Sequence, residues 1–147
     1  MEFTELDREL SRIFNLQEES VFILRPKKYG NQLEFIYPDD LNGLTMPLMN
    51  QSILGKTVRQ KSPSILNDFQ GETDVIYLNS IIMEGTQSSI RKMIAFPICL
   101  ARQICAVLLV TRKDPDGSSF QDFVEEDLPK IRLAVDKMIY LQLVKSA

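Results

Sequence analysis

Two strongly apolar segments of the chain follow each other with almost no connection between them. Residues 92–100 and residues 103–111 are both rich in Ile, Val, Leu and other apolar side chains, and at most residues 101–103 connect them. A connection this short cannot carry the chain back to the start of a parallel strand, so the two segments can pair only as an antiparallel hairpin. The sequence therefore predicts an antiparallel sheet around its most apolar part.

Shorter strands precede this hairpin. Residues 20–28 are rich in β-branched and aromatic side chains, a turn at Gly30 and Asn31 follows, and Leu, Phe and Tyr then recur at every second position over residues 33–37. This pattern predicts a second hairpin. Residues 64–66 are expected to form a further short strand.

Two loop segments are more apolar than exposed loops need to be. Residues 38–51 combine turn-forming residues with several Leu and Met side chains, and residues 67–89, predicted to be irregular or partly helical, carry Val, Ile, Leu and Tyr. Between them, Ser52 is a suitable N-cap for a short helix that ends at about residue 59. Such apolar loops must cover something, and we expect them to roof a pocket.

Amphipathic helices are predicted at both ends of the chain. In residues 1–15, apolar side chains recur at spacings of three and four, and this narrow stripe is typical of a coiled-coil seam. The last helix is expected to be regular only from about Asp127, because Pro129 lacks a backbone donor. From Ile131 onward the apolar side chains of the last helix occupy more than one of its sides. Both terminal helices are therefore expected to pack against a partner.

Length and composition indicate one ordinary domain. A chain of 147 residues that is 44% hydrophobic and 25% charged can bury a core without disulfides or metals. No repeat, linker or low-complexity tract divides it. We therefore expect a single domain over residues 1–147, with a helix at 1–15, the sheet and its loops at 20–119 and a helix at 120–147.

Charge and hydropathy narrow the set of partners. Seventeen Lys and Arg against twenty Asp and Glu give a net charge of −3, whereas nucleic-acid binding requires a basic surface. The longest apolar run, residues 104–110, is too short to cross a membrane, and the first residues do not resemble a signal peptide. We expect a cytoplasmic protein with neither nucleic acid nor membrane among its partners.

The absence of histidine restricts the chemistry. The commonest neutral-pH base, zinc ligand and haem ligand are all missing. The sequence also contains no phosphate-binding Gly-rich loop, no Gly-x-Ser-x-Gly elbow and no Cys-x-x-Cys. It predicts a non-catalytic binding or interaction module with no metal and no cofactor.

Several short motifs occur in a characteristic order. The first are Gly55 in the short helix and the segment 63–68 after that helix. A Phe-Pro-Ile sequence follows at residues 96–98, and Ala106 precedes Val and Leu in the next strand. The last is the segment 123–128 at the start of the final helix. In this order and spacing the whole chain resembles a GAF domain. One departure is Ala106, which stands where the family pattern has glycine.

The resemblance implies an α+β fold and a site. The expected fold is a six-stranded antiparallel sheet with the N- and C-terminal helices packed on one face and a loop-roofed pocket on the other. By similarity, the second strand, the two apolar loops and residues 92–99 would line the pocket. The expected ligand-binding residues are Phe35, Tyr37, Met46, Met49, Asp68, Tyr77, Met83, Arg91 and Phe96. The alternative is that most of them only fill a core.

Several known ligands of the family do not suit this sequence. Bilin and haem require a histidine that the chain lacks, and two residues of the cyclic-nucleotide motif are missing. Members that reduce free methionine sulfoxide use cysteines in the pocket loops, whereas Cys99 and Cys105 fall in predicted strands. An anionic ligand would find a positive group at Arg91 or Lys92.

Two functions follow from the resemblance. The first is a non-catalytic sensory domain that binds an unknown small molecule and relays the signal through its terminal helices to a linked or separate output domain. The alternative is a dimerisation and signal-relay module without a ligand. For either function we expect a homodimer through its terminal helices. The expected interface residues are Leu6, Leu10, Ile13, Ile131, Met138 and Leu141.

The cysteines offer a further possibility. A three-residue hairpin loop at 101–103 would place Cys99 opposite Cys105, where a disulfide would be strained. A two-residue loop would shift the register by one and separate the sulfurs. We expect free, buried and unreactive thiols.

Overall fold

The computed structural model describes residues 2–29, 31–68, 71–82, 90–113 and 121–146. For residues 141–146 it describes the helical backbone but not the side chains. The expected pocket residue Met83 therefore lies outside the described residues, and the side chain of Leu141 lies outside the described side chains.

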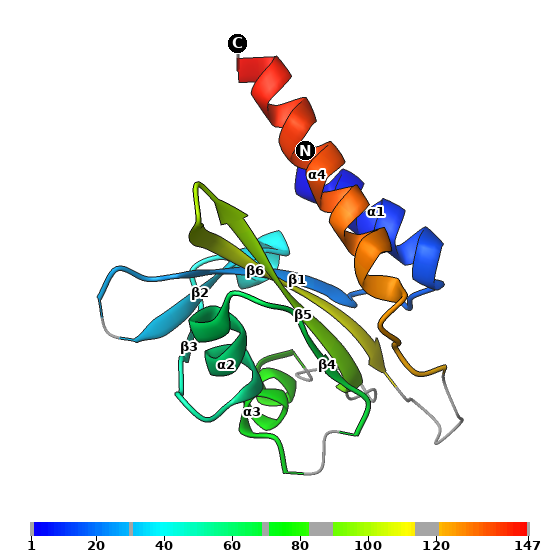
Figure 1. Cartoon of the computed structure of the whole chain (residues 1–147). Helices are drawn as coiled ribbons and strands as arrows, with labels where there is room; N and C mark the ends of the chain where they lie inside the picture. Colours follow the sequence, from blue (N-terminus) through cyan, green and yellow to red (C-terminus); the bar gives the residue numbers. More distant parts are fainter. Residues whose placement is uncertain (1, 30, 69–70, 83–89, 114–120, 147) are drawn as a thin grey trace.

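A six-stranded sheet forms the centre of the molecule (Figure 1). In spatial order the strands are β3, β2, β1, β6, β5 and β4, and every pairing is antiparallel. The strands are β1 (Val21–Pro26), β2 (Gln32–Tyr37), β3 (Thr45–Pro47), β4 (Ser64–Leu66), β5 (Ile90–Leu100) and β6 (Gln103–Lys113). The expected α+β fold and its antiparallel hairpins are confirmed.

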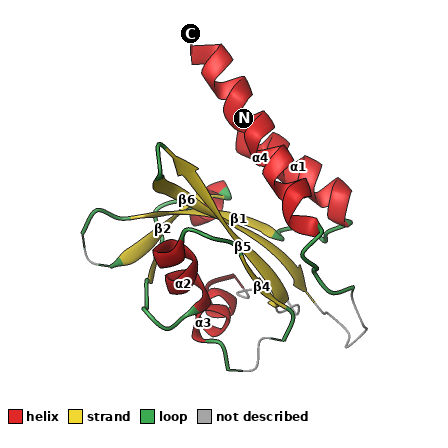
Figure 2. Cartoon of the chain, in the orientation of Figure 1, coloured by secondary structure: helices red, strands yellow, loops and turns green. Residues whose placement is uncertain are grey.

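Helices cover both faces of the sheet (Figure 2). Helices α1 (Glu2–Phe14) and α4 (Asp127–Ser146) lie side by side on one face, while α2 (Ile53–Gln60) and α3 (Thr73–Ile82) lie on the other. A short 3-10 helix, η1 (Asp39–Leu41), follows β2. The molecule therefore has three layers, and each face of the sheet has its own apolar core.

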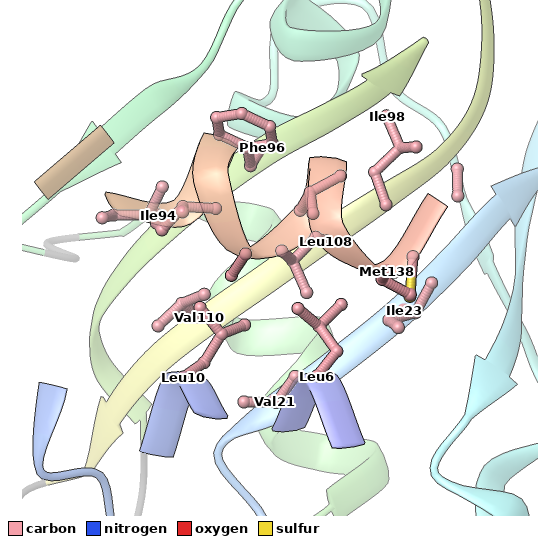
Figure 3. Packing of buried hydrophobic residues seen from close by; sticks show 14 of the residues in the cluster. Leu6, Leu10, Val21, Ile23, Ile94, Phe96, Ile98, Leu108, Val110 and Met138 are labelled. Carbon is pink, nitrogen blue, oxygen red and sulfur yellow. The ribbon is translucent and has the colours of Figure 1, made fainter. Parts of the chain in front are cut away.

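Alternation along the strands divides the side chains between the two cores. In β1, Val21 and Ile23 face α1 and α4, whereas Phe22 and Leu24 face α2 and α3. Figure 3 shows the first core, in which Leu6 and Leu10 from α1 and Met138 from α4 meet strand side chains. The strand residues labelled in that view are Val21, Ile23, Ile94, Phe96, Ile98, Leu108 and Val110.

The last helix begins at Asp127, as expected from Pro129, whereas residues 121–126 are not helical, so the expected range of 120–147 begins too early. Pro129 is its third residue, so the donor it lacks belongs to the first turn, which has no intrahelical acceptor. The Asp127 carboxylate accepts a hydrogen bond from the Val124 N–H at 2.9 Å. The proline thus fits the start of α4 without disturbing it.

A β-bulge in β2 changes which face its last residues occupy. Ile23 and Leu24 are consecutive in β1, yet they pair with Tyr37 and Phe35, so Ile36 is an extra residue in β2. Because a bulge interrupts the alternation, Phe35 faces α2 and α3 while Tyr37 packs against the core of α1 and α4. Two residues apart in sequence, they lie on opposite faces.

The turn between β5 and β6 has two residues. Leu100 pairs with Gln103, and the intervening Ala101 and Arg102 have φ angles of 52° and 67°. Positive φ at both central positions is the hallmark of a type I′ turn, which favours Asn-Gly and penalises side chains such as these. The chain thus forms a tight hairpin with an unfavourable turn sequence.

Replacing the turn by Asn-Gly is expected to stabilise the protein. The double variant Ala101→Asn with Arg102→Gly should raise the free energy of unfolding by about 1–2 kcal/mol, because the new residues adopt the left-handed region at lower cost. The Lys61 ammonium bonds to the backbone carbonyl of Arg102, so this contact survives the change. Urea denaturation measures the difference, and a loss of stability would contradict the turn assignment.

The register also settles the position of the cysteines. Cys99 pairs with Ile104, and Cys105 is an extra residue between the pairs on either side of it. Both thiols are free, but Cys99 is half-buried and Cys105 is exposed, so the expectation of buried thiols was wrong. Desolvation raises the pKa of Cys105, and its thiol donates to the Ile98 carbonyl at 3.2 Å.

Candidate functional site

The face covered by α2 and α3 is where the sequence places a ligand pocket. Two of the expected residues, Phe35 and Met46, lie there and are only 0% and 1% exposed. A side chain that lines a ligand-sized cavity would be accessible to a water-sized sphere. Leu54 and Leu78 from the covering helices and Met93 from the sheet are equally buried. Across the described part of this face, side chains fill the space.

The sheet separates two other expected pocket residues from this face. Phe96 is buried in the core of α1 and α4, and Tyr37 packs at its margin. Phe96 follows the alternation of β5, and Tyr37 is turned over by the bulge at Ile36. Their assignment to one pocket with Phe35 was therefore wrong, because a sheet lies between them.

The other expected pocket residues in the described part of the chain come from separate segments. Met49 is half-buried in the segment before α2, and Tyr77 is exposed on α3. Asp68, after β4, and Arg91, the extra residue at the start of β5, are also exposed. Each of these two makes an interaction of its own. The structure thus does not gather the eight expected residues that it describes into one cavity.

A buried carboxylate joins α3 to the start of α2. Asp74 is almost fully buried and accepts a hydrogen bond from the Leu54 N–H at 2.8 Å, while Glu72 accepts from the Ile53 N–H at 3.1 Å. Ser52, the N-cap, accepts from a third N–H of α2. These acceptors satisfy the donors at the helix N-terminus and favour its dipole. The position that could attract an anion is thus occupied by the chain's own acids.

The stability contributed by Asp74 is expected to depend on pH. Desolvation raises its pKa, the bonds from Leu54 and Ser52 oppose the shift, and Glu72 adds to it. A carboxyl with a raised folded-state pKa binds more protons folded than unfolded. The free energy of unfolding of the wild type, relative to Asp74→Asn, should therefore fall as pH rises from about 4 through the folded-state pKa. Urea denaturation at several pH values measures it, and a relative gain in stability with rising pH would contradict it.

An open groove runs between α1 and α4 on the outer side of the other face. Its volume is about 340 Å³, and its floor is formed by Leu6, Ala134 and Met138. Charged side chains of both signs line its rim, and Lys137 reaches across to Glu9 at 3.8 Å. The rim residues are Glu5, Arg8, Glu9, Arg12 and Lys137. The groove is thus a concave site with an apolar floor and a charged rim.

The residues expected at a dimer interface lie mostly inside the protomer. Leu6 and Leu10 of α1 and Ile131 and Met138 of α4 are buried against each other and the sheet, and Ile13 is half-buried beside them. The narrow stripe of α1 thus meets α4 of the same chain. These side chains therefore need no second copy to cover them, and the dimer stays a prediction.

Other apolar side chains remain exposed on α4. Leu133 is 74% and Tyr140 65% exposed. With Lys137 between them, they follow a spacing of four and three, so they form one stripe along the edge of the groove. Leu133 is not among the residues expected from the sequence, although an apolar residue seven positions before Tyr140 and outside the buried stripe is a readable signal.

Tyr37 ties α1 to the sheet. Its hydroxyl donates to the Asp7 carboxylate, which also accepts from Ser11 at 3.0 Å, and its ring packs against Phe3 at 6.2 Å between centroids. Desolvation raises the pKa of the Tyr37 hydroxyl, and the bond to Asp7 raises it further. The bulge that removes Tyr37 from the expected pocket thus gives it a role in holding α1.

Solved structures share this architecture. The GAF-B domain of DevS from Mycobacterium smegmatis matches with a TM-score of 0.60 and 15% identity, covering 99% of this chain and 93% of that one. The GAF domain of an Acinetobacter phosphoenolpyruvate-protein phosphotransferase matches with a TM-score of 0.59 and 15% identity, over 92% and 78%. The chain has the GAF fold. No family profile and no curated protein matches the sequence.

The GAF fold also occurs in a structure of an enzyme. A free methionine-R-sulfoxide reductase from Neisseria meningitidis matches with a TM-score of 0.57 and 15% identity, covering 93% of this chain and 76% of that one. In the present chain both cysteines lie at the β5–β6 hairpin, away from the loops that cover the α2–α3 face.

The described residues contain no cluster of His, Cys, Asp or Glu suited to a metal ion. No helix in the described part of the chain is long and apolar enough to cross a membrane.

Proposed function

We propose that this chain is a non-catalytic regulatory domain that forms a homodimer through α1 and α4 and relays a signal between these helices and an output domain. The observation that carries the proposal is the contrast between the two faces. In the described part of the chain, the face of the expected pocket is filled by its own side chains, whereas the helix pair presents an exposed apolar stripe beside an open groove.

The groove suits the same helix pair of a second copy. Its apolar floor is bordered by acidic and basic side chains that alternate along α1, from Glu5 through Arg8 and Glu9 to Arg12. A rim of both signs can pair with itself across a two-fold axis, where each cation of one copy meets an acid of the other. Leu133 and Tyr140 then gain apolar burial that they lack in the protomer.

We favour signal relay without a ligand over the sensing of a small molecule. A ligand in the expected pocket would have to displace Phe35, Met46 and their buried neighbours, at a cost in apolar packing. The GAF domain from the Acinetobacter phosphotransferase is part of a larger protein, which supports an output domain for this chain as well. The cytoplasmic location expected from the sequence stays a prediction.

Sedimentation velocity with two exposed-site variants tests the proposed dimer. At micromolar concentration we expect the wild type to be a dimer and Leu133→Glu to be a monomer, because a charge would enter the interface. The matched control is Ile76→Glu, which alters a 54% exposed side chain on α3 and should leave the dimer intact. A monomeric wild type, or dissociation in the α3 variant alone, would overturn the proposal.

Thermal denaturation with added small molecules tests the closed face. Nucleotides, amino acids and common metabolites are each expected to leave the melting temperature unchanged, because no bound state would stabilise the fold. A concentration-dependent rise with any of them, abolished by a substitution at Met46, would instead establish the sensory function.

A further inference from the structure

Phe123, just before α4, is held by a pair of hydrogen bonds from a distant side chain. The amide of Asn67 donates to the Phe123 carbonyl at 2.9 Å and accepts from the Phe123 N–H at 2.8 Å. Asn67 directly follows β4. Two bonds, one to the N–H and one to the carbonyl of the same residue, fix the orientation of its backbone as well as its position, whereas one bond would leave it free to pivot.

The ring of Phe123 is held by a second group. It is buried, the Arg112 guanidinium carbon lies 4.7 Å from its centroid, and the ring of Phe14 meets it edge-on at 6.2 Å. Arg112 also donates to the Phe14 carbonyl at 2.8 Å, at the C-terminus of α1, where a cation favours the helix dipole. The end of α1, the end of β6 and the base of α4 thus meet at one aromatic ring.

β4 is suited to carry a displacement to this point. It is one of the two edge strands, has three residues and, in the described sheet, pairs only with β5 (Figure 1). It is also linked to α2, because the hydroxyls of Thr57 and Ser64 lie 2.9 Å apart. A movement of α2 therefore reaches β4 directly. Asn67 lies two residues after Ile65, the central residue of β4, so it would move with the strand.

We propose that Asn67 is a positioning residue that fastens the base of α4 to the end of β4, so that a displacement of α2 and β4 is transmitted to the terminal helices. Arg112 extends the connection from Phe123 to the end of α1. The inference rests on the proposed relay function and names where its input enters: the α2–β4 edge of the sheet.

The chain contains a matched control for this contact. Asn79, on α3, makes the same pair of bonds to a backbone group: its amide accepts from the Ile90 N–H at 2.8 Å and donates to the Ile90 carbonyl at 3.4 Å. This pair connects α3 to β5 and does not touch α4. Leucine at either position removes both bonds and keeps the number and branching of the side-chain heavy atoms, so the two variants differ in place and not in chemistry.

Native-state hydrogen exchange of the full chain distinguishes the two leucine variants. In Asn67→Leu we expect the amides of Phe123 and of the first two turns of α4 to exchange about tenfold faster or more, after correction for global stability from urea denaturation. In Asn79→Leu the acceleration should be confined to α3 and the start of β5. Equal acceleration of α4 in both variants, or none in Asn67→Leu, would overturn the inference.

A third variant separates positioning from general stability. Asn67→Asp keeps an acceptor for the Phe123 N–H but, when ionised, loses the donor to its carbonyl, and a protonated carboxyl restores that donor. The protection of the α4 amides against hydrogen exchange, relative to the wild type, should be low at pH 7 and recover at about pH 4. Protection that stays low at acid pH would contradict a role for the paired bonds.

The oligomeric state keeps this inference separate from the proposed function. Sedimentation of the same two leucine variants is expected to show weakened dimerisation for Asn67→Leu and an unchanged dimer for Asn79→Leu. If the wild type is a monomer, the relay function fails while the exchange result still reports whether Asn67 positions α4. If the dimer forms and exchange in α4 is insensitive to Asn67, only the present inference fails.

Discussion

Replacing Gly55 by alanine is expected to destabilise the protein by about 3 kcal/mol or more, although the same change in a helix usually stabilises it by about 1 kcal/mol. Gly55 lies in the first turn of α2, and a Cβ built on it would come within 1.8 Å of the Met49 carbonyl oxygen. That carbonyl accepts bonds from the Ser52 N–H at 3.2 Å and the Ser52 hydroxyl at 2.8 Å. It can move away only if the N-cap of α2 is disrupted.

Lys56→Ala is the control for this prediction. Lys56 is exposed, directly follows Gly55 in the same helix, and should change the free energy of unfolding by no more than about 0.5 kcal/mol. Urea denaturation of both variants measures the difference. A Gly55→Ala protein as stable as the wild type would show that the segment before α2 does not approach the helix as the structure has it.

Replacing Leu10 by glutamate is expected to lower the free energy of unfolding by about 4 kcal/mol or more, because it would bury a carboxylate and remove apolar packing. Leu10 is 0% exposed. Its side chain lies in the core that α1 and α4 form with the sheet (Figure 3). If Leu10 lay in a dimer seam, as the sequence pattern alone suggests, the same change would dissociate the dimer and leave the fold intact.

Leu133→Glu provides the matched comparison, since it makes the same substitution at an exposed position of α4. Its free energy of unfolding should change by about 0.5 kcal/mol or less in the monomer, so the two variants separate folding from association. Circular dichroism melts at low protein concentration measure both. A stable, well-folded Leu10→Glu monomer would contradict the placement of α1 against its own sheet.

Local patterns in the sequence determine most of the architecture. The short connection after residue 100 permits only an antiparallel hairpin, Ser52 begins α2 as its N-cap, and Asp127 begins α4. The order of these elements is enough to indicate the GAF fold. Each of these features depends on residues close together in the chain, where spacing, capping and turn length act directly on the backbone.

Side-chain partners across the sheet are decided only by the tertiary structure. The alternation of Phe35 and Tyr37 predicts one shared face, but one extra residue in β2 places them on opposite faces. No local preference marks that bulge in the sequence, because it depends on the register with β1. The same holds at the other hairpin, where the register leaves Cys105 unpaired.

The same distinction explains the surfaces of α1 and of the expected pocket. A narrow apolar stripe predicts that α1 packs against another helix, and it does, but sequence cannot show whether that helix belongs to the same chain. Likewise, apolar loops predict that something lies beneath them, without showing whether a ligand or Phe35 and Met46 fill the space. Composition determines that apolar surface is buried, and three-dimensional packing alone decides against what.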